Sequence, residues 1–130
     1  FDVAHPQANR YLEQQVATAT PAMLTAMLFD AIVANSLRAV DSLVDDDQVT
    51  ARKALIRAQE IVLELRSTLN HDAGGDLARN LDRLYDFAYR KLLEGSLRGD
   101  QAAVLAAVEV IAPLRDSWRT ACVGAPVPVS

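Results

Sequence analysis

The chain has 130 residues, enough for one domain with a hydrophobic core of its own. Its formal net charge is −4 and no basic cluster stands out along it, so nucleic acid is not an expected partner. Hydrophobic residues make up 51% of the chain but aromatic residues only 5%, a balance that favours Ala- and Leu-rich helices over a β-sandwich.

Targeting and membrane signals are not evident in the sequence. No apolar stretch approaches the roughly 20 residues of a membrane-spanning helix. The N-terminal part is polar and interrupted by Pro6, unlike a signal peptide. A single cysteine, Cys122, cannot form an internal disulfide and points to a reducing compartment. We therefore expect a cytoplasmic protein without membrane insertion.

The N-terminal part holds one short helical candidate. Residues 1–9 show no apolar periodicity and are expected to be flexible, whereas Tyr11, Leu12 and Val16 give residues 10–17 a helical pattern. A helix this short is unstable alone, so it must dock on the rest of the chain. The sequence thus predicts a small N-terminal cap helix.

A long and very apolar helix follows. Thr20 and Pro21 fit an N-cap and a first helical residue, and the helical pattern runs to about Val44. Its apolar side forms two stripes: Leu24, Leu28, Ala31, Asn35 and Ala39, and then Phe29, Val33, Leu37, Val40 and Val44. Together they cover roughly 200° of the helix, against the roughly 100° that a surface helix needs. We expect this helix either to be central in the fold or to present part of its surface to a partner.

Three further helices complete the predicted fold, at roughly 49–69, 74–99 and 101–121. The expected core-facing stripes are Ala54, Ala58, Ile61, Leu65 and Leu69; Leu77, Leu81, Leu84, Ala88 and Leu92; and Val104, Val108, Ile111, Trp118 and Cys122. Helices of this length joined by short turns predict an all-α, antiparallel four-helix bundle. We expect one domain over residues 1–130, with a flexible tail at 123–130.

No catalytic or metal-binding constellation is evident. His5 lies in the expected flexible segment and His71 in a turn, and the sequence lacks the Glu-x-x-His pairs that a metal site in a helical bundle would use. Glu60 and Glu64 share a helix face without a histidine nearby, and Cys122 lies on an apolar stripe where inert packing is expected. We therefore predict no enzyme activity, no metal and no cofactor.

Several apolar residues are in excess of what one core needs. They are Phe29, Val33, Leu37, Ile56, Leu63 and Phe87. As a set they indicate a surface that receives amphipathic helices of a partner. A constitutive helical homodimer, acting as a structural or adaptor module, would use the same surface as its own interface. A metallo-bundle enzyme is a more distant alternative.

Three blocks of the sequence resemble the FliS-type flagellin export chaperones. YLEQQVATATPAMLTAMLFDAI (Tyr11–Ile32) is similar to that family's N-terminal tyrosine, its proline turn and its Leu-(Tyr/Phe)-Asp helix. AGGDLARNLDRLYDFAYRKLL (Ala73–Leu93) is similar to its Gly-Gly turn and Leu-Tyr-Asp helix, and LRDSW (Leu114–Trp118) to its closing helix. The blocks occur in the family's order and spacing. The departures are Thr20 where serine is usual, Gly95-Ser96 where Ala-Asn is common, and Pro113 in the last helix.

The resemblance implies a fold, a function and partners. Family members are antiparallel helical bundles with an N-terminal cap, which corresponds by position to Tyr11 and Val16 here. The resemblance implies that this chain binds the disordered C-terminal segment of flagellin in the cytoplasm, prevents its premature polymerisation and delivers it to a component of the flagellar type III export gate. The predicted partner-binding residues are Tyr11, Val16, Phe29, Val33, Leu37, Ile56, Leu63, Tyr85 and Phe87.

Overall fold

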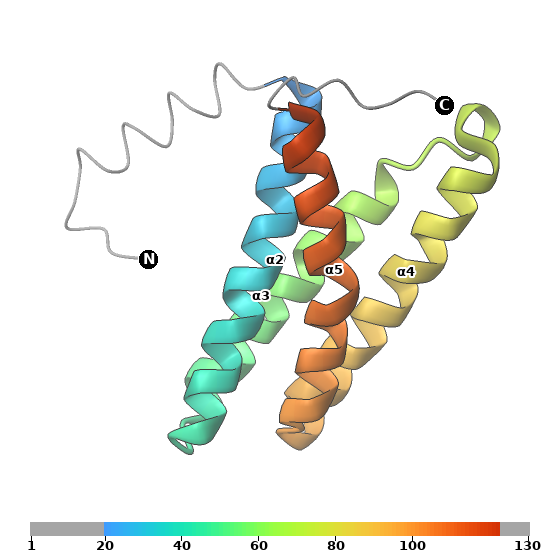
Figure 1. Cartoon of the computed structure of the whole chain (residues 1–130). Helices are drawn as coiled ribbons and strands as arrows, with labels where there is room; N and C mark the ends of the chain where they lie inside the picture. Colours follow the sequence, from blue (N-terminus) through green and yellow to red (C-terminus); the bar gives the residue numbers. More distant parts are fainter. Residues whose placement is uncertain (1–19, 123–130) are drawn as a thin grey trace.

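A computed structural model describes residues 20–122 of the chain, which form four α-helices (Figure 1). The helices are α2 (Pro21–Val44), α3 (Gln48–Ser67), α4 (His71–Arg98) and α5 (Gln101–Cys122). Successive helices run in opposite directions in Figure 1. The predicted all-α, antiparallel four-helix bundle is therefore confirmed. The predicted cap helix, with Tyr11 and Val16, lies outside the described residues.

Polar residues cap the start of each helix. The side chain of Thr20 accepts a hydrogen bond from the Met23 N–H at 3.2 Å, and Asp47 accepts one from Thr50 at 3.1 Å. The equivalent bonds at the other two helices run from Ala73 to Asn70 at 3.0 Å and from Ala103 to Asp100 at 3.2 Å. These bonds satisfy backbone donors that a helix leaves unpaired at its N-terminus. The helix starts predicted at 21, 49 and 101 lie within one residue of the observed ones, whereas the start predicted at 74 is three residues too late.

The turn predicted at Gly74 and Gly75 lies inside α4. The helix begins earlier, at His71, because Asn70 provides an N-cap there. Gly75 has φ 53° and ψ −127°, a conformation open to glycine alone, so the helix is broken at this residue. The first turn of α4 is thus a separate piece whose direction differs from the rest of the helix.

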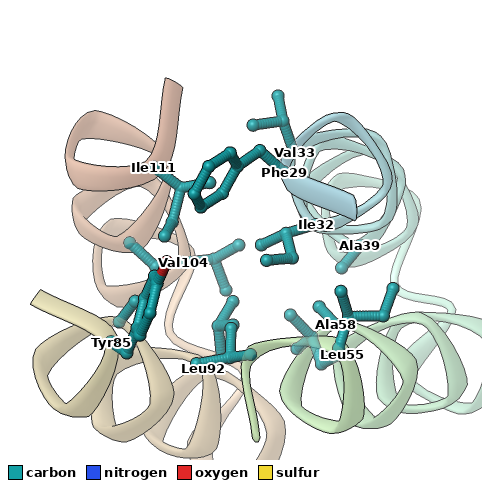
Figure 2. Close-up of a cluster of buried hydrophobic side chains, with 14 of the residues drawn as sticks. Phe29, Ile32, Val33, Ala39, Leu55, Ala58, Tyr85, Leu92, Val104 and Ile111 are labelled. Carbon is teal, nitrogen blue, oxygen red and sulfur yellow. The ribbon is translucent and has the colours of Figure 1, made fainter. Parts of the chain in front are cut away.

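The four helices form a ring in which each packs on two neighbours. The contacting pairs are α2 with α3, α3 with α4, α4 with α5, and α5 with α2, while helices on the diagonals barely touch. Side chains from all four helices meet in the centre of the ring, as Figure 2 shows for Ile32, Leu55, Leu92 and Val104. These residues are fully buried or nearly so. The bundle therefore has one continuous core.

Phe29, Val33 and Tyr85 belong to this core, which corrects their prediction as partner-binding surface. Phe29 is completely buried and the other two nearly so. In Figure 2 the Phe29 ring extends from α2 toward Ile111 of α5. Its centroid lies 6.2 Å from that of Tyr85 and 5.2 Å from that of Trp118. The physical reason is the position of α2, which buries a wide arc because it packs on α3 on one side and on α5 on the other.

The inward face of α4 also differs from the predicted stripe. Leu77 is exposed and Leu84 is half-buried, whereas the buried residues are Ala78, Leu81, Tyr85, Ala88, Leu92 and Gly95. The inward face is therefore rotated toward Tyr85. The aromatic ring of Tyr85 packs against Phe29 of α2, the helix diagonally opposite α4. The other predicted core stripes fit better, since Ala54, Ala58, Ile61 and Leu65 of α3 are all buried.

By length and composition alone, α2 could cross a membrane, because its most apolar 18-residue window has a mean hydropathy of 1.4. The expectation that no apolar stretch approaches this length is therefore wrong. In the bundle, α2 contacts α3 and α5 and buries Phe29, Ile32 and Val33 in the core. The place of α2 in the bundle accounts for its composition.

Candidate partner-binding surface

A network of ion pairs joins α3 to α4 and shows which sides of the two helices face each other. Arg66 donates to Asp82 at 2.7 Å and to Asp86 at 3.4 Å, and Asp86 also pairs with Arg90 at 3.1 Å. The hydrogen bond from Arg66 lowers the pKa of Asp82 below its ordinary value, and the same bond raises the pKa of Arg66. All these groups are partly exposed, so the network orients the two helices more than it stabilises them.

Four exposed apolar residues lie along this side of the α3–α4 pair, and we call them the α3–α4 strip. On α3, Leu63 lies one turn before Arg66 and Ile56 lies two turns before Leu63; they are 44% and 48% exposed. On α4, Leu93 lies two turns after Asp86 and Leu97 follows one turn later; they are 36% and 71% exposed. Because α3 and α4 pack side by side, the four residues lie along one side of the helix pair.

Two hollows lie at opposite ends of the α3–α4 pair, and the first includes Leu97 of the α3–α4 strip. One, of about 100 Å³, lies where α3 begins and α4 ends and is lined by Arg52, Leu97 and Arg98 among others. The other, of about 310 Å³, lies at the α3–α4 turn and is lined mainly by apolar residues, including Leu69, Leu77 and Leu81. The first hollow shows that Arg52 of α3 and Leu97 of α4 are close neighbours.

Phe87 and Leu37, two further predicted partner-binding residues, are exposed but lie elsewhere. Phe87 is on a different side of α4 from Leu93, with the Lys91 ammonium 5.7 Å from its ring centroid. Leu37 lies on α2, two turns after Asp30, whose carboxylate pairs with Arg119 of α5 at 2.8 Å. Leu37 therefore faces the α2–α5 side of the bundle.

The predicted partner-binding set is thus divided among several places. Ile56 and Leu63 share one groove, Leu37 and Phe87 lie on two other sides, and Phe29, Val33 and Tyr85 are in the core. Sequence reasoning missed Leu93 and Leu97, which complete the α3–α4 strip. The signal that could have found them is their position on α4: both lie off the predicted core stripe, one and two turns after Arg90.

Within residues 20–122, no group of three or more His, Cys, Asp or Glu side chains is arranged to hold a metal ion. Cys122 is half-buried at the end of α5. The exposed apolar residues of the α3–α4 strip suit the binding of another protein segment.

Comparisons with known proteins agree with this picture. The model of the family described as "Flagellar protein FliS" matches residues 4–125. The flagellar secretion chaperone FliS of Bacillus subtilis (strain 168) is 34% identical over 112 residues, which cover 85% of this chain and 82% of that protein. The protein of the same name from Salmonella typhimurium is 33% identical over 109 residues, covering 83% and 81% of the two chains.

A solved structure shares the fold. The crystal structure of a bacterial flagellar chaperone superimposes with a TM-score of 0.72 at 21% identity, and the match covers 89% of this chain and 97% of that one. The family match spans nearly the whole chain, and the two relatives exceed 30% identity over most of their length. The chain therefore belongs to the FliS family of flagellar secretion chaperones.

Proposed function

We propose that this protein is a cytoplasmic export chaperone that binds the disordered C-terminal segment of flagellin. Binding keeps flagellin from polymerising before export, and the complex is then delivered to the flagellar export gate. The proposal is supported by membership of the FliS family, whose members in Bacillus subtilis and Salmonella typhimurium are named flagellar secretion chaperones. The single observation of the bundle that carries it is the exposed α3–α4 strip.

The α3–α4 strip is long enough to contact two turns of a client helix. Ile56 and Leu63 are seven residues apart, which corresponds to about 10.5 Å along α3. A client helix with apolar residues on every second turn can therefore contact both of them, together with Leu93 and Leu97 on the facing side. A segment that folds only on binding loses chain entropy, so it needs several such contacts along its length to reach a useful affinity.

Calorimetry with the flagellin C-terminal segment tests the proposal. A charge placed in a groove that the client desolvates is costly, so Leu63→Asp should weaken binding at least tenfold. Leu105→Asp is the matched control, because Leu105 has a similar exposure (41%) but lies on α5, away from the α3–α4 strip. Both variants should keep the melting temperature of the parent chain, since both positions are exposed.

Two results would contradict the proposal. One is the absence of binding between the unmodified chain and the flagellin segment. The other concerns the homodimer alternative and uses the mass of the protein in solution. If Leu63→Asp converts a dimer into a monomer while binding of the segment is unchanged, the strip is an interface between two copies of this chain.

A further inference from the structure

Basic residues are concentrated on one half of the bundle. The chain has a net charge of −4, yet nine of its thirteen Lys and Arg residues lie on α3 and α4: Arg52, Lys53, Arg57, Arg66, Arg79, Arg83, Arg90, Lys91 and Arg98. Only seven of its seventeen carboxylates lie there: Glu60, Glu64, Asp72, Asp76, Asp82, Asp86 and Glu94. The α3–α4 pair is therefore a basic surface on an acidic protein.

Most carboxylates of α4 are already engaged by cations of the same two helices. Asp82 and Asp86 bind Arg66, and Asp86 also binds Arg90. Asp76 pairs with Arg79, and Glu94 pairs with Lys91. Among residues 20–122, the structure shows no carboxylate within ion-pair distance of Arg52 or Arg83. Positive charge is thus left over on this surface.

A line of two arginines borders the α3–α4 strip: Arg83, which has no ion pair among residues 20–122, and Arg90, whose partner Asp86 is shared with Arg66. Arg83, Arg90 and Leu97 follow one another at intervals of seven residues, so they form a line along the exposed side of α4. Leu93 of the strip lies one turn after Arg90, and Arg52 lines the same hollow as Leu97. The strip consequently has an arginine border along α4 and a further arginine at the end where α3 begins.

The arginines on the α2–α5 side are in a different situation. Asp30 of α2 accepts a hydrogen bond from Arg119 at 2.8 Å and lies 3.8 Å from Arg115, which also pairs with Asp116. These cations are therefore neutralised within the bundle. A carboxylate of a partner would therefore add little binding energy beside Arg115 or Arg119, and more beside Arg83.

We infer that the α3–α4 strip takes an amphipathic helix whose apolar residues are bordered by carboxylates, and that these carboxylates lie against Arg83 and Arg90. This inference rests on the proposed function, since the helix belongs to the flagellin client. A guanidinium binds a carboxylate in a bidentate arrangement, which fixes the register of the helix along the groove. Because the two arginines are about 10.5 Å apart along α4, carboxylates two turns apart on the client reach both.

Two single substitutions that change the net charge by the same amount test how much Arg83 contributes to the affinity for the flagellin segment. Arg83→Glu should weaken binding of the flagellin segment about 3- to 10-fold at low salt, and less at high salt, because exposed ion pairs are screened. Arg38→Glu is the control, since Arg38 is an exposed arginine on α2, diagonal to α4 in the ring. It should change the affinity by no more than about twofold, which is less than the loss expected for Arg83→Glu.

Cross-linking tests the contact itself. A carbodiimide joins a lysine amine to a carboxylate only when the two touch, so Arg83→Lys and Arg90→Lys chains should cross-link to Asp or Glu of the bound segment. Lys53 and Lys91 are internal controls, because both lie on the same two helices but away from the arginine border.

The outcomes separate this inference from the proposed function. If Leu63→Asp abolishes binding but Arg83→Glu acts no more strongly than Arg38→Glu, the chaperone function stands and the inference is overturned. Cross-links formed only through Lys53 or Lys91 overturn it as well. If the unmodified chain does not bind the segment, the proposed function fails, and this inference fails with it.

Discussion

The rings of Phe29 and Trp118 meet edge to face, with centroids 5.2 Å apart and planes at 67°. This arrangement is favourable for aromatic pairs because the positive edge of one ring faces the negative face of the other. Phe29 also contacts Tyr85 of α4, so one side chain of α2 connects two other helices of the bundle. Its role is therefore to hold the bundle together and not to bind a client.

Phe29→Ala should lower the free energy of unfolding by about 3–5 kcal/mol, because it removes a fully buried ring and leaves a cavity beside Tyr85 and Trp118. Leu37→Ala, on the same helix but exposed, should change it by less than about 1 kcal/mol. Denaturant unfolding followed by circular dichroism measures both. Equal effects of the two substitutions would show that Phe29 is not a core residue.

Gly95→Ala should destabilise the bundle although alanine is the better helix former. A methyl group at this position would collide with the Cγ2 methyl of Val104, a fully buried residue whose branched side chain is stiff. Overpacking costs about 1–3 kcal/mol, while the gain in helix propensity is about 1 kcal/mol, so a net loss is expected. In a double-mutant cycle with Val104→Ala the two changes should be less than additive, because the second removes the collision. Strict additivity would rule out this collision as the cause.

Tyr85 should make the protein sensitive to alkali. Burial raises the pKa of its hydroxyl from 10.0 to about 12, since the ionised form is poorly solvated in the core. Between these two values the unfolded chain loses the proton while the folded protein keeps it, so stability falls as the pH rises. Below pH 10 both states are protonated and the group makes no pH-dependent contribution.

Chemical unfolding of the parent chain and Tyr85→Phe across this pH interval measures the effect. The variant should lose less stability than the parent chain as the pH rises, because it has no hydroxyl to ionise at this position. Parallel losses in the two proteins would show that the hydroxyl of Tyr85 is not the group responsible.

The α3–α4 strip, Leu37 and Phe87 are exposed apolar sites that give separable predictions for client binding. If the α3–α4 strip is the principal groove, Leu63→Asp should weaken binding of the flagellin segment more than Leu37→Asp or Phe87→Asp does, because those two residues lie on other sides of the bundle. Isothermal titration of the three variants, with melting curves as folding controls, compares the sites directly. A larger loss for Phe87→Asp would place the main groove on the other side of α4.

Helix boundaries were accessible from the sequence because they depend on local interactions. Thr20, Asp47 and Asp100 each cap a helix through a backbone group three residues away, and Gly99 ends α4 in the left-handed conformation, with φ 63°. The seven-residue spacing of Ile56 and Leu63, opposite the alanine-rich stripe of α3, likewise predicted that both would be exposed. Every one of these signals lies within about two turns of a single helix, so it is present before the helices meet.

The burial of each apolar side of α2 was decided only by the tertiary structure. Phe29, Val33 and Leu37 fall in one stripe of the sequence, yet the first two are buried and the third is exposed. The difference arises because Phe29 packs against Tyr85 and Trp118 of two other helices, whereas Leu37 remains exposed on α2. The α3–α4 strip is also a tertiary feature, since Ile56 and Leu63 belong to α3 while Leu93 and Leu97 belong to α4, and the four share one side of the bundle only when the two helices pair. Periodicity within one helix fixes which residues share a side, but the neighbouring helices determine which side loses contact with water.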